Sequence, residues 1–192
     1  MNRVFGVLAL VAAFAGGAIA QQTTIVGTAP GQGGVAQITQ ATATITAIDS
    51  STREVTLKGP QGNEFVVTAG PEVKNFANMK VGDSVTVQYL SALSLKLEKG
   101  GGMAVTRTEQ SGTAAAPPGS MPAGAVGRQV TVVADVIDVN PATQTVTLRG
   151  PKRTVDVVVA DPEQFKRVAK GDQVLATYTE AVAISVAPAA PK

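Results

Sequence analysis

The sequence contains no cysteine, no histidine and no tryptophan, and these absences exclude several classes of function. Without Cys and His, the chain cannot assemble a Ser-His-Asp or Cys-His catalytic group, or a zinc site built from those ligands. Without Cys it also has no disulfides and no lipid-attachment thiol. We therefore expect a protein that is not an enzyme, has no catalytic or cofactor-binding residues, needs no cofactor, and is stabilised by burial alone.

Concentrated charge and aromatic residues are scarce as well. The formal net charge is +2 and aromatics make up 4% of the chain. The densest basic cluster is Lys152-Arg153, with Arg149 nearby. A nucleic-acid-binding face needs a concentrated positive patch, usually with stacking aromatics. We therefore expect no nucleic-acid partner.

Long apolar runs are limited to one, near the N-terminus. Arg3 precedes the apolar run 4–15, and the small residues of Ala18-Ile19-Ala20 precede Gln21. This pattern predicts a secretory signal peptide over residues 1–20, cleaved between Ala20 and Gln21. The run is too short to span a hydrocarbon layer of about 30 Å. We expect a periplasmic protein whose mature chain does not insert into the membrane.

The chain contains an internal repeat. The segment "VTLKGP" at 55–60 returns as "VTLRGP" at 146–151, 91 positions later. Matches continue in order on both sides. At the offset of 91, Ala43 matches Ala134 and Ile48 matches Val139. After a gap of two residues the offset becomes 89, and there Phe76 matches Phe165, Gly82-Asp83 matches Gly171-Asp172, and Tyr89 matches Tyr178. Such ordered matches indicate a duplicated fold.

Composition sets the expected boundaries between the copies. Stretches rich in Gly, Ala, Pro, Ser and Gln flank them, and such composition is typical of flexible segments. Alternation of Thr with Val, Arg and Glu predicts a short strand at 103–109 inside the linker. The expected organisation is a signal peptide (1–20), a flexible lead (21–37), repeat 1 (38–99), a linker (100–127), repeat 2 (128–187) and a disordered tail (188–192).

Within each copy the apolar residues alternate with period two, which predicts half-buried strands. In the first copy the strands are expected at 38–48, 54–58, 64–68, 84–89 and 93–98. Pro71 and Pro162 fit the first position of a helix, and Asp161 can cap the second one. Gly82 and Gly171 are expected to take the positive φ of tight turns before the next strand. The sequence therefore predicts an all-β fold of two tandem five-stranded small barrels, each with a short helix between strands 3 and 4.

This element order resembles the oligonucleotide/oligosaccharide-binding (OB) barrel, with the SH3-like barrel as the second choice. The "I-D-x-x-T-x-x-V-T-L-K/R-G-P" hairpin at 48–60 and the "K-x-G-D" turn at 80–83 also resemble the uncharacterised small β-barrel domains of exported bacterial proteins. The resemblance covers both copies. It implies a fold and carries neither a reaction nor a ligand.

Three residue types leave other functions open. Met79, Met103 and Met121 could bind Cu(I) if their sulfurs converged. Carboxylates could serve a hydrolase, although Asp83 and Asp172 are expected in turns, and Glu72 and Glu163 at helix starts, where the dipole favours negative charge. Tyr89 and Tyr178 match one another and are interpreted as core residues whose hydroxyls can face a ligand.

The duplication and the missing catalytic residue types favour a non-catalytic, exported binding or scaffolding protein of the bacterial envelope. Its partner is expected to be an envelope protein or a small ligand, held by two sites acting together. The alternatives are a methionine-based periplasmic copper chaperone and, third, a carboxylate-dependent hydrolase.

Overall fold

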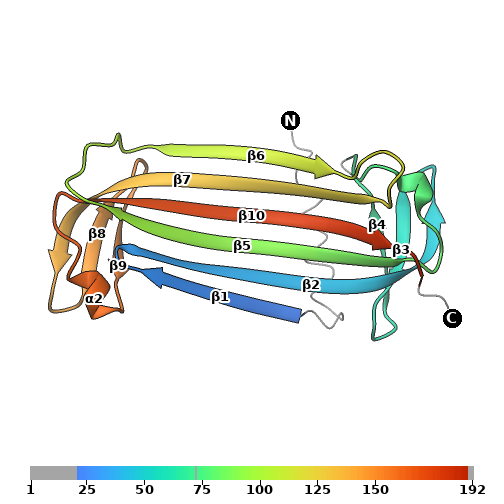
Figure 1. Cartoon of the computed structure of the whole chain (residues 1–192), viewed down its shortest axis with the longest axis horizontal. Helices are drawn as coiled ribbons and strands as arrows, with labels where there is room; N and C mark the ends of the chain where they lie inside the picture. The colour runs from blue at the N-terminus through green and yellow to red at the C-terminus, as the bar shows by residue number, and fades with distance from the viewer. Residues whose placement is uncertain (1–20, 72, 190–192) are drawn as a thin grey trace.

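The protein is an elongated antiparallel sheet of ten strands (Figure 1). The structure, a computed structural model, describes residues 21–71 and 73–189. The first half contributes β1 (Gln21–Ala29), β2 (Gln32–Asp49), β3 (Glu54–Lys58), β4 (Glu64–Thr68) and β5 (Ser84–Glu98). The second half contributes β6 (Arg107–Ala115), β7 (Ala123–Asn140), β8 (Thr145–Arg149), β9 (Thr154–Val158) and β10 (Gln173–Ala187).

The two halves have the same elements in the same order. Their matching strands have equal lengths, of 9, 18, 5, 5 and 15 residues. A single helical turn precedes the last strand of each half, as η1 (Phe76–Asn78), which is a 3-10 turn, and α2 (Pro162–Phe165). Pro162 begins α2 as predicted, but the prediction of a helix beginning at Pro71 is wrong, since η1 begins only at Phe76. As the sequence predicts, Asp161 caps α2, because its side chain accepts from the backbone N–H of Glu163 and Gln164.

The last strand of each half joins the two halves. The strand order is β4-β3-β2-β5-β10-β7-β8-β9, so β5 and β10 are neighbours in the middle. They pair along all 15 residues, with Ser91 opposite Glu180. The sequence predicts two strands at 84–89 and 93–98, but the structure has one. The intervening Leu90, Ser91 and Ala92 include no Gly, Pro, Asn or Asp to form a turn.

A single open sheet therefore replaces the two closed five-stranded barrels that the sequence predicts. A small barrel would need the end of β5 to fold back onto its own half. That end instead runs alongside β10 towards the other half, as Figure 1 shows. Antiparallel pairing over the full strand satisfies the backbone groups that separate barrels would have satisfied by closure.

The segments expected to be flexible are strands. Residues 21–37, predicted as a flexible lead, form β1 and the start of β2, which pair from Gln21–Gln40 to Ala29–Gln32. Within the predicted linker 100–127, β6 (Arg107–Ala115) overlaps the end of the short strand expected at 103–109, continues beyond it, and pairs with β7. Small residues cause this difference. Thr, Ala and Gly read as low complexity in sequence, yet they fit an exposed hairpin once a long neighbouring strand offers its edge.

A β-bulge divides each 18-residue strand into two parts. The register of β2 shifts between Ile45 and Ala47, and that of β7 shifts between Val136 and Asp138. The strand pairs first with β1 or β6, and then, on both sides of the bulge, with β3 or β8 of the end hairpin. A bulge bends its strand, and Figure 1 shows the end hairpins running across the long axis.

Each end of the molecule has its own apolar core. The core at the β3–β4 end, here called the first cluster, combines first-half residues such as Ile45 and Leu57 with Val182 and Val186 of β10. The core at the β8–β9 end, the second cluster, is centred on Val136, Val146 and Phe165. The last strand of the second half thus completes the core of the first, whereas the second cluster consists of second-half residues.

The two "GD" turns hold these exchanged strands in place. Gly82 and Gly171 have positive φ angles of 96° and 95°, as the sequence predicts for tight turns. The buried carboxylate of Asp83 accepts from the N–H of Lys80 in its own turn and from the N–H of Ala189, beyond β10. The contact with Ala189 ties this turn of the first half to the chain that arrives from the second.

Asp172 makes the reciprocal contacts. It accepts from the N–H of Ala169 in its turn, and from the N–H of Gly100 and Nζ of Lys99, just beyond β5. Burial by itself raises the pKa of Asp172, but the hydrogen bonds from Lys99, Ala169 and Gly100 outweigh it and hold that pKa below its usual value. Both acids are therefore structural.

Two expectations fall partly or wholly outside the described residues. The predicted signal peptide, including Ala20, is not described, and Gln21 is the first residue of β1. Of the predicted tail 188–192, residues 188 and 189 are described. No helix in the described part of the chain has the length and hydropathy to cross a membrane.

Strand exchange between the halves predicts unequal effects at two matching positions. Val182 is 3% exposed in the first cluster, whereas its match Leu93 is 39% exposed. We expect Val182→Ala to lower the free energy of unfolding by about 2 kcal/mol, since it removes two buried carbons and leaves a cavity. Leu93→Ala should cost under about 1 kcal/mol. Urea denaturation measures both, and equal losses would contradict the exchanged core.

Candidate functional site

The three methionines proposed for copper do not lie together. Met79 and Met121 both pack against the first cluster, near Val186 at one end of β10. Met103 lies at the other end of β10, where its backbone N–H and C=O both bond the side chain of Gln173. At roughly 3.3 Å per residue, β10 spans about 40 Å between Gln173 and Val186. One chain therefore cannot bring the three sulfurs onto one ion.

The candidate acids are also spread out. Asp83 and Asp172 are the structural turn residues at opposite ends of the sheet. Glu163 lies in the first turn of α2 and pairs with Lys166 at 2.6 Å. Glu72 is outside the described residues. None of the described acids from the hydrolase hypothesis therefore faces another across a cleft.

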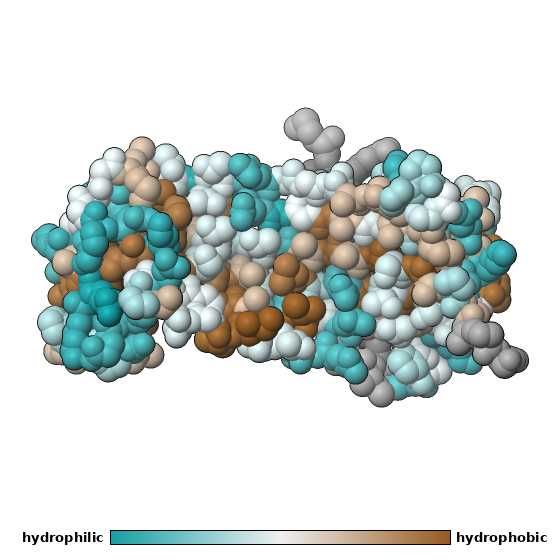
Figure 2. All heavy atoms as spheres, viewed as in Figure 1, coloured by the Kyte–Doolittle hydropathy of each residue, from teal (hydrophilic) through white to brown (hydrophobic). Residues whose placement is uncertain are grey.

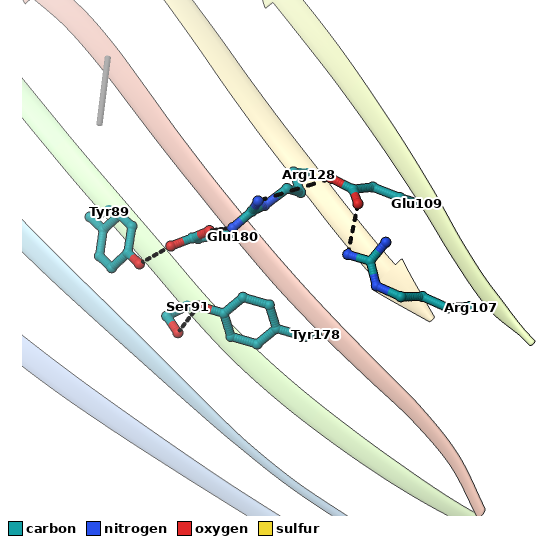
Figure 3. A network of polar contacts seen from close by, with 7 residues as sticks. All are labelled: Tyr89, Ser91, Arg107, Glu109, Arg128, Tyr178 and Glu180. Atoms are coloured by element: carbon teal, nitrogen blue, oxygen red, sulfur yellow. Dashed lines mark hydrogen bonds and ion pairs between the residues drawn. The ribbon is translucent and has the colours of Figure 1, made fainter. Parts of the chain in front are cut away.

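The two matching tyrosines are brought close together by the β5–β10 pairing. Tyr89 and Tyr178 lie on the same face in the middle of the sheet, flanking the Ser91–Glu180 pair (Figure 3). The hydroxyl of Tyr89 donates to Glu180 at 2.6 Å, and the hydroxyl of Tyr178 accepts from Ser91 at 3.4 Å. Both rings are half-buried. The sequence shows that they match, but only the pairing of β5 with β10 makes them neighbours.

A chain of charges continues from this point to the β6 edge. Arg128 of β7 pairs with Glu180 at 2.7 Å and lies 4.0 Å from Glu109, which pairs with Arg107 at 2.7 Å (Figure 3). The hydrogen bond from Tyr89 lowers the pKa of Glu180, helped by Arg128 and opposed by burial. Burial, and then the bond to Glu180, raises the pKa of Tyr89. Glu180 is thus kept ionised and Tyr89 kept neutral.

This network is a structural junction and lacks the features of a catalytic pair. A general acid or base works best with its pKa near the operating pH. The pKa values of Glu180 and Tyr89 are moved away from neutrality, in opposite directions. The network therefore stabilises the β5–β10–β7 junction.

The pKa of Glu180 predicts a pH dependence of stability. Because this pKa is lower in the folded state, the ionised carboxylate stabilises the fold above its unfolded pKa, and this gain is lost as the pH falls through the folded pKa. We expect Glu180→Gln to cost about 1–3 kcal/mol near neutral pH and to flatten the fall in stability between about pH 5 and pH 3. Urea denaturation across that range measures both effects.

Glu109→Gln is the control for this prediction. The Glu109 side chain is 39% exposed, against 12% for Glu180, so its ion pairs should contribute under about 1 kcal/mol. Equal effects of the two substitutions would show that the buried position of Glu180 has no energetic consequence.

The strongest candidate for a binding site is an apolar groove at the β8–β9 end. Its volume is about 260 Å³, near the lower limit of roughly 300 Å³ for small-ligand pockets. Figure 2 shows apolar side chains at this end and over the middle of the sheet. Both halves contribute to the wall: Thr28, Gly31, Gln32, Gly33, Leu95 and Leu97 from the first, and Val146, Leu148, Val157, Val159, Ala160, Asp161, Gln164, Val168 and Val174 from the second.

The matching place at the other end is filled. There the loop 116–122, between β6 and β7, covers the first cluster: Met121 packs against it, and Pro122 is fully buried. Between β1 and β2 the turn is only Pro30-Gly31. The backbone follows the same path at both ends, because the N–H of Val186 donates to Pro122 O and that of the matching Leu97 donates to Gly31 O. Gly31 thus stands where Pro122 stands, without its ring.

The missing cover leaves apolar residues exposed. Leu95 lines the groove and is 37% exposed. Next to it an apolar row crosses the sheet, from Val26 through Val35 to Leu93, with exposures of 70%, 39% and 39%. We call this row the central stripe. The groove and the central stripe together form an apolar surface that reaches from one end of the sheet to its middle.

A second hollow carries no comparable argument. It is lined by Arg53, Ala69, Pro71, Val73, Lys74 and Asn75. Arg53 already donates to the carbonyls of Ala69, Gly70 and Val73 and stacks over Phe76 at 4.7 Å. The guanidinium of Arg53 is therefore already bound within the fold, by these carbonyls and the ring of Phe76.

Sequence reasoning missed the groove because it treated 21–37 and 100–127 as flexible. The signal was present, since the offset of 91 can be carried back to match Val35 with Val126 and Gly33 with Gly124. The same alignment shows that only the second half has a long loop before its second strand. No family model, curated protein or solved structure matches the chain, so the resemblance to exported small-barrel domains stays a prediction.

Proposed function

We propose that this protein is a non-catalytic binding protein, exported to the bacterial envelope, that holds an apolar partner in the groove at its β8–β9 end. The observation that carries the proposal is the difference between two matching ends, one closed by the protein's own loop and the other open. The N-terminal export pattern and the absence of His and Cys support the location and the non-catalytic role.

An open groove of this kind has an energetic cost to the free protein. Leu148 lies half-buried in the groove, whereas its match Leu57 is 1% exposed in the first cluster. Exposed apolar surface costs roughly 25 cal/mol per Å² relative to burial. Contiguous exposed apolar surface on a soluble chain commonly marks an interaction site. Covering the groove and the central stripe would recover that free energy on binding.

The copper-chaperone alternative has less support. Met79 and Met121 share one end, but both pack against the first cluster, and Met103 is far from them. Binding of Cu(I) by one chain would need the first cluster to open. The carboxylate hydrolase has no facing pair among the described candidate acids.

A dye titration tests the proposed site. Nile red, a neutral apolar dye, should bind the wild-type protein saturably, with an increase in fluorescence. Val157→Gln places an amide in the groove without a partner, and we expect it to weaken binding about tenfold, which corresponds to about 1.4 kcal/mol. Val158→Gln is the matched control, because Val158 is the next residue on β9, is 68% exposed and does not line the groove.

Val158→Gln should leave the dye affinity within about twofold of wild type. If the dye shows no saturable binding, or if both variants bind as tightly as the wild type, the groove is not the binding site. Circular dichroism and urea denaturation of each variant establish that any loss of binding is not a loss of fold.

A further inference from the structure

The loop at the β3–β4 end shows what kind of chain segment this architecture accommodates. The segment runs from Pro117 to Pro122 over the first cluster. Its carbonyls are held at three points: Pro117 O accepts from Asn75 Nδ2 at 2.7 Å, Ser120 O accepts from Asn78 Nδ2 at 3.0 Å, and Pro122 O accepts from Val186 N at 2.9 Å. Between these points Met121 and Pro122 supply the apolar contacts.

The β8–β9 end keeps the surroundings of that segment but lacks the segment. Gln164, the match of Asn75, donates to Ala29 O and accepts from Gly31 N, which fixes the short turn beside the groove. Val168 and Leu148 line the groove, at the positions matched by Met79 and Leu57 in the first cluster. The wall of the groove therefore leaves room for side chains like those of Met121 and Pro122, which the short β1–β2 turn does not provide.

The groove also lies beside backbone groups that are open to a further strand. Along the described chain, β1 pairs only with β2, and β9 pairs only with β8. Thr28 of β1 and Val157 of β9 both line the groove. An extended peptide placed there would find unpaired N–H and C=O groups as well as apolar side chains, which is the usual basis of strand addition. A small apolar molecule would leave those backbone groups unused.

We propose that the occupant of this groove is an extended, uncharged peptide segment of a partner protein, carrying a large apolar residue followed by proline. It supplies the apolar side chains that Met121 and Pro122 supply at the opposite end and that Pro30-Gly31 lacks. This inference rests on the proposed function and names the chemical class of its partner. Its apolar residue enters the space between Leu148 and Val168, and its proline covers Leu97 above Gly31.

The probe is the protein's own loop as a synthetic peptide. The sequence of residues 116–123, APPGSMPA, is made with blocked ends and a fluorophore, and is titrated into the full chain with fluorescence anisotropy as the readout. A second peptide carries Asp in place of the Met that corresponds to Met121. We expect saturable binding of the first peptide and about tenfold weaker binding of the second, because a carboxylate would be buried unpaired.

Two protein variants locate the binding. Val157→Gln should weaken the peptide about tenfold, and Val158→Gln should leave it within about twofold. In a third variant, residues 116–122 replace Pro30-Gly31, so that a loop like that of the second half can cover the groove. This variant should melt at a higher temperature than wild type and should lose the peptide.

The outcomes separate this inference from the proposed function. If Nile red binds and the peptide does not, the inference of a peptide partner is wrong, and the groove remains a site for a small apolar ligand. If neither binds, both the peptide inference and the proposed function are wrong. Peptide binding that Val157→Gln does not weaken places the peptide elsewhere and also overturns the inference. Sedimentation of the wild type over a range of concentrations supplies the last outcome. If it self-associates and Val157→Gln abolishes this, the occupant is a second copy of the chain.

Discussion

The pairing of β5 with β10 is the constraint on which the rest of the structure depends. These strands are the last of their respective halves, and they pair over their full length with Ser91 opposite Glu180. Because each runs past the middle, each delivers its final residues to the end hairpin of the other half. Val182 and Val186 thereby enter the first cluster, and Leu95 and Leu97 reach the wall of the groove. The first half therefore does not hold all the residues of its own core, because Val182 and Val186 come from the second half.

The same pairing explains where polar groups are buried. Antiparallel contact places matching residues near one another around the middle of the strands, so Tyr89 and Tyr178 become neighbours on one face. Glu180 can be half-buried there because Tyr89 and Arg128 satisfy its two oxygens. At the outer ends, Asp83 and Asp172 are buried for a comparable reason, since each accepts backbone N–H groups from both halves. Acids that looked like candidates for chemistry in the sequence are used to join the two halves.

The candidate site arises from a small departure from symmetry within this frame. The end strands, the "GD" turns and the backbone bond to Gly31 or Pro122 are alike at both ends. The difference that opens the groove is one loop, which is long before β7 and two residues long before β2. At one end the loop completes the core with Met121 and Pro122, and at the other a groove of about 260 Å³ stays open. A repeat that is nearly symmetrical can in this way make one stable end and one receptive end.

Much of the local structure could be predicted from the sequence. Period-two alternation located the short strands, Gly82 and Gly171 were predicted to take positive φ, and Asp161 was predicted to cap a helical turn. Each of these depends on residues close in the chain, whose steric and hydrogen-bonding preferences act locally. The tertiary structure decided the rest. Whether β5 folds back onto its own half or continues into the other depends on contacts between residues about 90 positions apart, and the sequence pattern is compatible with either.

The groove, too, combines residues that the sequence predicts as strand positions with an exposure that only the tertiary structure decides. Its individual residues read as ordinary apolar strand positions, and in sequence Leu93 and Leu95 look as buried as their matches Val182 and Ile184. Their exposure was decided by what lies over them, a loop at one end and a two-residue turn at the other. The sequence by itself determined an all-β chain that has no His or Cys and carries the same hydrophobic pattern twice. Only the tertiary structure determined that one copy is covered and the other is left open, because burial is a property of the neighbours a residue meets in space.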